Sequence, residues 1–193
     1  MRIDPVSVAV LFAVVLVAFL VLFLLVTTYN GVVALRQRID KAWANIEVVL
    51  KQRHDQLPNL VNAVRGMMGF ERDVLEEVTR QRARGSPDDA PPVQAAASEG
   101  TTAAVRTLFA TVEAYPELKS QTNVLKLQGE IERLEAMIAD RRELYNDSVY
   151  RYNTTIATVP ALILAPLFGW HAREFFAATA DDRARPDVSL RPG

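Results

Sequence analysis

The chain lacks cysteine and has only two histidines among its 193 residues. Without cysteine it forms no disulfide and offers no thiolate ligand to a metal. His54 and His171 stand in separate segments, and the sequence has none of the Glu-x-x-His pairs that ferritin-like bundles use. It also lacks a Gly-x-Ser-x-Gly elbow and a glycine-rich phosphate loop. We therefore predict no metal, no cofactor, no catalytic residue and no enzymatic activity.

The sequence also lacks an excess of charge of either sign. Its 22 basic and 23 acidic residues give a formal net charge of −1, whereas a nucleic-acid binder needs basic residues for its phosphate contacts. Nucleic acid is thus excluded as a partner. No segment alternates apolar and polar residues for long enough to predict a strand. The expected fold class is all-α.

A long apolar run, Val6–Val26 with Leu16 at its centre, contains no charge and has Ser7 as its only polar side chain. At about 1.5 Å per residue a helix of this length spans about 31 Å, which matches the hydrocarbon core of a bilayer. The run predicts a single membrane-spanning helix. Because neither proline nor charge interrupts the residues up to Val33, that helix is expected to continue into the following domain.

The alternative interpretation of this run is a cleaved signal peptide, and Val32-Val33-Ala34 offers a passable cleavage site. The run exceeds the usual signal-peptide core of about 7–15 residues, which favours an uncleaved anchor. Basic residues follow the span at Arg36, Arg38 and Lys41, whereas only Arg2 and the α-amine precede it. The positive-inside bias therefore predicts that the bulk of the chain lies in the cytoplasm.

Beyond the anchor, assigned to residues 1–28, heptad-like stripes predict an antiparallel four-helix bundle with long, rod-like helices over residues 29–176. Pro58 restricts Leu57 to extended geometry, so a tight turn is expected at about 56–58. Pro87, Pro91 and Pro92 indicate a linker. The expected elements are helices at about 29–57, 58–84, 101–115 and 123–159, a linker at 85–100 and a flexible tail at 177–193.

The last and longest helix has Val124, Ile131, Ile138, Tyr145, Tyr152 and Val159 at strict seven-residue intervals. Such a stripe suits packing in a bundle, self-association or docking of a partner helix. The apolar segment Pro160–Trp170 that follows is too short to span a bilayer. It is expected either to cap the bundle or to lie among lipid headgroups.

Three charged residues occupy positions where these stripes call for apolar side chains: Arg53, Glu71 and Arg141. We hypothesise that they form a partly buried polar cluster, with a Glu71–Arg141 pair that sets helix register. The alternative is that their long side chains reach solvent at the stripe edge. The other helical glutamates, Glu135 among them, are mostly expected on solvated faces.

Two further polar groups suggest local roles. His54 beside Asp55 is expected to help finish the first helix at the turn rather than to act in acid–base chemistry, since adjacent helical residues point in different directions. Asn45, Asn62 and the asparagines of the Tyr29-Asn30, Tyr145-Asn146 and Tyr152-Asn153 dipeptides are expected to make interhelical hydrogen bonds. The alternative is that they line a polar seam for a partner or ligand.

Several strings resemble the LemA family of bacterial membrane proteins, over about Tyr29 to Phe176. In order they are Tyr29-Asn30, Leu35-Arg36, Ala42-Trp43, Asn45-Ile46, Arg53-His54-Asp55, Pro58-Asn59-Leu60-Val61, Glu113-Ala114-Tyr115-Pro116, Leu118-Lys119, Glu135, Ile138, Arg141, Tyr145-Asn146, Val149, Tyr152-Asn153, Ile156 and Pro160. Gln56 and Phe70 depart from the family pattern, the latter where members often have histidine. The resemblance implies one N-terminal membrane helix followed by an antiparallel helical bundle, and it brings no activity.

Together these features predict a single-pass membrane protein of the bacterial inner membrane whose bundle is an interaction or scaffolding module. The expected partners are the lipid bilayer and a second copy of the chain or another membrane protein. The alternative is a membrane-tethered sensor that binds a small-molecule ligand in a pocket around Arg53, Glu71 and Arg141. A closed polar cluster would favour the scaffold, and an open cavity the ligand binder.

Overall fold

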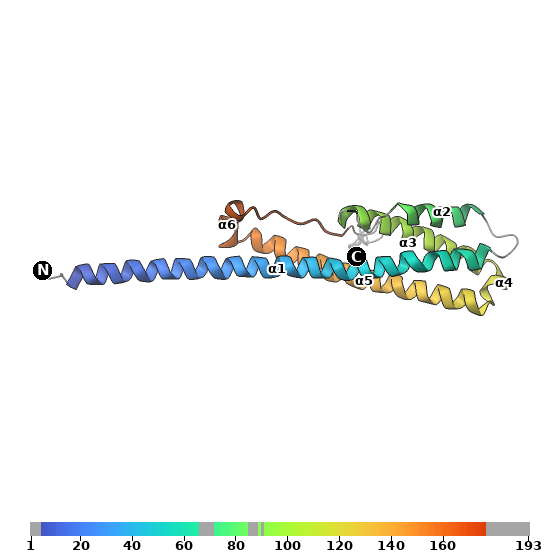
Figure 1. Cartoon of the computed structure of the whole chain (residues 1–193), viewed down its shortest axis with the longest axis horizontal. Helices are drawn as coiled ribbons and strands as arrows, with labels where there is room; N and C mark the ends of the chain where they lie inside the picture. Colours follow the sequence, from blue (N-terminus) through green and yellow to red (C-terminus); the bar gives the residue numbers. More distant parts are fainter. Residues whose placement is uncertain (1–4, 66–71, 85–88, 90, 177–193) are drawn as a thin grey trace, which may run out of the picture. The chain divides into compact units, whose positions relative to one another are not determined.

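The computed structural model describes residues 5–65, 72–84, 89 and 91–176, and within them every regular element is an α-helix (Figure 1). The all-α class is therefore confirmed. The elements are α1 (Pro5–Arg65), α2 (Arg72–Ala83), α3 (Pro91–Glu113), α4 (Pro116–Lys119), α5 (Thr122–Ile156) and α6 (Ala161–Phe168). The predicted tail at 177–193 lies outside the described residues.

The chain divides into two compact units. Unit 1 comprises residues 1–40 and 148–173, and it holds the apolar N-terminal part of α1, the end of α5 and α6. Unit 2 comprises residues 41–147 and 174–193, and it holds the remainder of α1, all of α2 to α4 and most of α5. The predicted division at residue 28 remains a prediction.

The apolar run Val6–Val26 forms the first part of α1, and the helix continues without interruption to Arg65, as expected from the uninterrupted sequence. α1 is the one helix in the described residues that is long and apolar enough to cross a membrane. None of its most apolar window is buried by the protein. The apolar run makes about six helical turns, whose backbone groups bond within the helix as a bilayer requires, while its apolar side chains need an apolar environment.

The predicted turn at 56–58 is wrong, because α1 passes through Pro58. A proline in a helix has no N–H for the carbonyl four residues earlier, which here is that of His54. In this protein the guanidinium of Arg82 supplies the missing donor: its Nε donates to the His54 carbonyl at 2.9 Å. Arg82 lies near the end of α2, so α2 runs back along α1 and compensates for the proline.

The predicted linker at 85–100 is also wrong in its second half, because α3 begins at Pro91. Proline suits the first turn of a helix, where its missing N–H would have no partner, and the alanines that follow favour helix strongly. Gln94, Ala95 and Ser98 are buried. This segment therefore belongs to the packed domain, and the third helix is longer than expected.

The core of unit 2 is built from α1, α2, α3 and α5, the four-helix arrangement that the stripes predicted. Its largest fully buried side chains include Leu57, Leu60, Leu108, Ile131 and Leu134. The helix predicted at about 123–159 is α5, and its heptad residues from Val124 to Tyr152 are buried, whereas Val159 is 71% exposed. The α5 stripe is thus covered within the chain itself.

In unit 1, α6 packs on α1 through aromatic rings. The centroid of the Tyr29 ring lies 5.0 Å from that of Phe168 and 6.1 Å from that of Trp170. α6 ends at Gly169, whose φ of 63° is a left-handed conformation that glycine adopts without strain. The N–H of Trp170 closes this end by donating to the Ala165 carbonyl at 2.9 Å.

Candidate functional site

In unit 2 the charged side chain of Arg53, on α1, is only 4% exposed. Its Nη1 donates to Glu135 Oε1 on α5 at 2.8 Å and to Thr102 Oγ1 on α3 at 2.9 Å. Its Nη2 donates to Ser98 Oγ on α3 at 2.9 Å and to the Ser98 carbonyl at 3.4 Å. Thr102 Oγ1 in turn donates to Glu135 Oε2 at 2.7 Å. We call these four residues the Arg53 network.

The Arg53 network satisfies a charge that would otherwise be costly to bury. A guanidinium is planar and holds its donors in a fixed fork, so its neighbours must lie in defined directions. Those neighbours come from two other helices, which means that the network sets the register of α1 against α3 and α5 together. Charged hydrogen-bonded groups of this kind are better attested as specificity devices than as net stabilisers.

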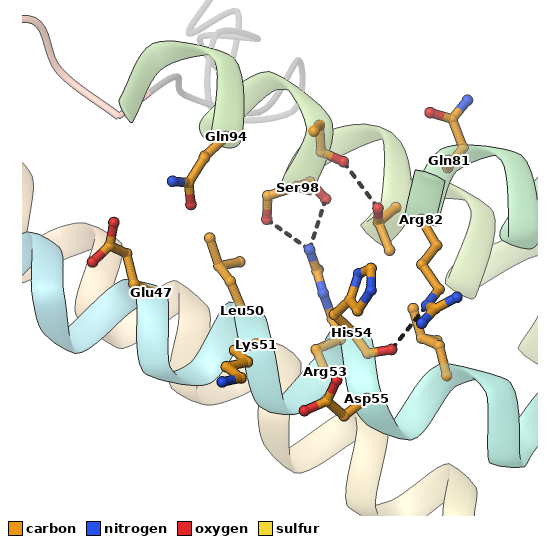
Figure 2. Close-up of a pocket in the computed structure, with 13 residues that line it drawn as sticks. Glu47, Leu50, Lys51, Arg53, His54, Asp55, Gln81, Arg82, Gln94 and Ser98 are labelled. Atoms are coloured by element: carbon orange, nitrogen blue, oxygen red, sulfur yellow. Dashed lines mark hydrogen bonds between the residues drawn. The ribbon is translucent and has the colours of Figure 1, made fainter. Parts of the chain in front are cut away.

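A cavity of ≈ 310 Å³ opens beside the network, between α1, α2 and α3 (Figure 2). Its volume is at the lower end of the range for small-molecule sites. Figure 2 shows Glu47 and Lys51 on the α1 side, Gln94 on the α3 side and Arg82 reaching across from α2. The complete lining is Glu47, Leu50, Lys51, Arg53, His54, Asp55, Leu57, Gln81, Arg82, Gln94, Ala97, Ser98 and Thr101.

His54 lines this cavity and is half-buried inside α1, so the prediction that it finishes a helix at residue 57 is wrong. Burial lowers the pKa of its imidazole below the usual value of about 6.5, and the positive charge of Arg82 lowers it further. Asp55 opposes this shift by raising the pKa, and Arg53 adds to it. Burial and the neighbouring arginines therefore favour the neutral imidazole over the cation.

A second cavity, of ≈ 470 Å³, lies among residues of α3 and α5. Ser98, Thr102 and Glu135 of the Arg53 network line it, together with Glu99. Glu99 has a buried carboxylate oxygen, Oε1, that has no hydrogen-bond partner. Within the residues that the structure describes, no group of three or more histidine and acidic side chains is placed to hold a metal.

Residues 42–190 match the LemA family. The chain belongs to the LemA family. It is also similar to the magnetosome proteins MamQ 1 and MamQ 2 of Paramagnetospirillum magneticum, each 25% identical over 186 aligned positions that cover 83% of this chain and 68% of the relative.

Two of the LemA strings noted in the sequence come together in the Arg53 network. Arg53 belongs to the string Arg53-His54-Asp55, and Glu135 is the isolated glutamate that the resemblance included. The expectation that Glu135 lies on a solvated face is wrong, since its side chain is 20% exposed and pairs with Arg53. Ser98 and Thr102 were missed because Ser98 fell in the supposed linker and both are common surface types.

The predicted cluster of Arg53, Glu71 and Arg141 remains a prediction. Glu71 lies outside the described residues, so its pairing with Arg141 has no geometry to report. Arg141 itself, on α5, donates from Nη1 to the Asn45 carbonyl of α1 at 2.8 Å. Arg53 and Arg141 therefore each tie α5 to α1, through different partners.

The LemA Tyr-Asn dipeptides hold the extended segment that follows α6. In unit 2, Asn146 Nδ2 donates to the Phe176 carbonyl at 3.3 Å and its Oδ1 accepts from the Phe176 N–H at 2.8 Å. In unit 1, Asn153 makes the same two-way pair with Arg173, at 2.9 Å and 2.8 Å. The expected interhelical hydrogen bonds are therefore wrong for these two asparagines, because their amides bind the backbone of a non-helical segment, and the polar seam stays a prediction.

Proposed function

We propose that this LemA protein is a membrane-anchored, non-enzymatic interaction module that scaffolds protein assemblies at the bacterial inner membrane, with its bundle on the cytoplasmic side. The single observation that carries the proposal is the Arg53 network. Every strong polar contact of its buried cation is made within the chain, on two other helices. A centre whose charge is already neutralised and hydrogen-bonded suits a rigid framework better than a reacting group.

Two other features support the same proposal. The apolar part of α1 is uncovered by the protein, as expected of a segment that meets lipid. The MamQ proteins that the chain resembles are named for a structure, the magnetosome, and not for a reaction. A scaffold confined to a membrane searches in two dimensions and needs only modest affinity for its partners.

Self-association is part of the proposal, but its support differs from what the sequence indicated. The heptad stripe of α5 is buried within the chain up to Tyr152 and has no face left for another copy. The remaining apolar surface on α5 is scattered over Leu125, Leu144 and Tyr150. If copies associate, we expect the contact to involve the N-terminal part of α1, where small and branched side chains pack in lipid.

The mass of the detergent-solubilised protein tests this point. We expect the full chain to run as an oligomer in light scattering coupled to size exclusion, and a version beginning at Tyr29 to run as a monomer. An oligomer in both would place the contact in the bundle. A monomer in both would contradict self-association and leave other membrane proteins as the only partners of the scaffold.

A second candidate function, a small-ligand sensor, is favoured by the cavity beside the Arg53 network. Lys51, His54 and Arg82 bring donors to its wall, which suits a small anionic ligand. The probes are inorganic phosphate and a four-carbon dicarboxylate, titrated against the full chain in detergent. A rise in melting temperature that is lost in Arg82→Met but kept in Arg84→Met, at the exposed end of α2, would establish the sensor. No shift with either anion would count against it.

A further inference from the structure

Unit 1 carries an apolar surface that nothing in the described chain covers. α6 has no charged side chain anywhere along its length. Its inner face is buried, for example at Leu164, whereas Ile163 and Leu167 are 71% and 76% exposed. We call the exposed side the outer face of α6; it is formed by Leu162, Ile163 and Leu167, together with Val159 just before the helix.

This outer face is unusual for a short helix at a protein surface. A surface helix normally turns its polar side to water, and a helix that is apolar all round is normally buried by protein or lipid. Single exposed apolar residues are common, but a contiguous patch indicates a contact surface. α6 is therefore expected to have a second contact besides its packing on α1.

The position of α6 along α1 indicates what that contact is. Tyr29, which packs against Phe168 and Trp170, stands three residues after Val26, or about 4.5 Å further along the helix axis. That is the level at which the membrane span leaves the hydrocarbon core. The ring centroids of Phe168 and Trp170 lie 5.2 Å apart, so three aromatic side chains gather at this level, as in the aromatic belts of membrane proteins.

We propose that the outer face of α6 rests on the same bilayer that the N-terminal part of α1 enters, with its side chains among the headgroups and upper acyl chains. The inference rests on the membrane anchoring in the proposed function and adds a second lipid contact to it. Lipid fits the face better than a second copy does, because the face adjoins the span at the level of Tyr29.

A second contact changes what the anchor does. A lone membrane helix is free to rotate about its axis and to tilt. With the outer face of α6 held on the bilayer, the α1 segment of unit 1 can no longer rotate freely about its axis, and its depth in the membrane is fixed. The interfacial helix thus orients the anchor as well as strengthening its attachment.

Because the protein has no cysteine, single labels can be placed on the full chain without altering it otherwise. The variants are Leu167→Cys on the outer face, Leu16→Cys within the anchor and Gln37→Cys on the exposed surface of α1, about 16 Å beyond Val26. Each carries an environment-sensitive fluorophore and is reconstituted in vesicles of phosphatidylcholine and phosphatidylglycerol with or without acyl-brominated lipid. We expect at least twofold more quenching at residues 16 and 167 than at residue 37.

The possible outcomes separate the inference from the anchoring on which it rests. Quenching at residue 16 with none at residue 167 would overturn the lipid contact of α6 and leave the anchor standing. Absence of quenching at both would overturn the anchor and the inference together. The label at residue 167 could instead be blue-shifted without being quenched by lipid bromine, and shift to the red on dilution to about one chain per vesicle. That result would assign the face to a second copy and overturn the lipid contact.

Discussion

At the scale of the residue, Arg53 illustrates how a charge is kept in a helical core. Removing one member of a buried, hydrogen-bonded pair is costly mainly because the other member is left without a partner. Replacing both by apolar residues of similar volume avoids that penalty. The Arg53–Glu135 pair should therefore behave differently in single and double variants.

We expect Arg53→Met to lower the free energy of unfolding by about 2–3 kcal/mol, less than for a fully buried pair because Glu135 is 20% exposed. Urea unfolding of the full chain in detergent, followed by circular dichroism, measures it. The double variant Arg53→Met, Glu135→Leu should recover at least half of the loss.

The matched control is the exposed ion pair Arg133–Glu130, in which the Nη2–Oε1 distance is 2.7 Å. Arg133→Met should leave the unfolding curve unchanged, because solvent screens a pair in which both side chains are largely exposed. If it destabilised the protein as much as Arg53→Met, burial would not be the cause of the Arg53 effect.

His54 gives unit 2 a pH dependence whose sign follows from its lowered pKa. Between that pKa and about 6.5 the unfolded chain binds a proton that the folded chain does not, so stability rises with pH in this window. The contribution is complete above about pH 6.5 and is lost as the pH falls through the folded-state pKa. When the pH is lowered from 7.5 to 5.5, we expect the melting temperature of His54→Gln to fall less than that of the wild type. Equal losses would contradict the assignment.

At the scale of the element, the route of α1 through Pro58 depends on Arg82. We expect Arg82→Met to destabilise the protein by about 1.5 kcal/mol, the lower end for a hydrogen bond from a charged donor, because the His54 carbonyl loses its partner. In a Pro58→Ala background the alanine N–H replaces the guanidinium, and the same change should cost much less. A double-mutant cycle from urea unfolding measures the coupling.

The control for this cycle is Arg84→Met, which removes an arginine from the end of α2 whose Nη1 contacts only Gln81 among the interactions described for it. It should show no coupling to Pro58. Equal costs of Arg82→Met in both backgrounds would mean that the proline is accommodated by some other means.

Asn153 should hold the segment after α6 in place. Its two hydrogen bonds to Arg173 fix that backbone to α5, so the segment is less able to leave the surface and enter a protease cleft. Asn153→Ala should speed tryptic cleavage after Arg173 several-fold in the folded protein. Asn123→Ala, at the exposed start of α5, is the control and should leave the rate unchanged. Unchanged cleavage in Asn153→Ala would show that α6 alone positions the segment.

At the scale of the whole molecule, the side on which the bundle lies is the property most open to a direct test. Arg36, Arg38 and Lys41 follow the span and favour retention in the cytoplasm. A C-terminal fusion to green fluorescent protein should fluoresce, and a fusion to alkaline phosphatase should be inactive. The reverse result would place the bundle outside and move the proposed partners with it.

The parts of the fold that sequence predicted are those where periodicity alone decides. The uncharged run at Val6–Val26 and the heptads of α5 each determine a helix locally, so both appear nearly as expected. The predictions at Pro58 and at the start of α3 were wrong, because a side chain on another helix compensates for Pro58 and Pro91 begins a helix. The Arg53 network was beyond reach for the same reason: its acceptors are distant in sequence and become neighbours only through packing.

The bond from Arg82 to the His54 carbonyl makes the end of α1 a conditional structure. Past Pro58 the helix depends on a hydrogen-bond donor from another helix, the Arg82 guanidinium. A group that competes for this guanidinium would weaken the helix there. A partner's carboxylate that paired with the guanidinium would leave the His54 carbonyl without a donor, because Pro58 has no N–H to replace it, and α1 should then hinge at the proline. We therefore expect the continuity of α1 past Pro58 to be sensitive to an acidic partner that reaches Arg82, far along the chain from the apolar run.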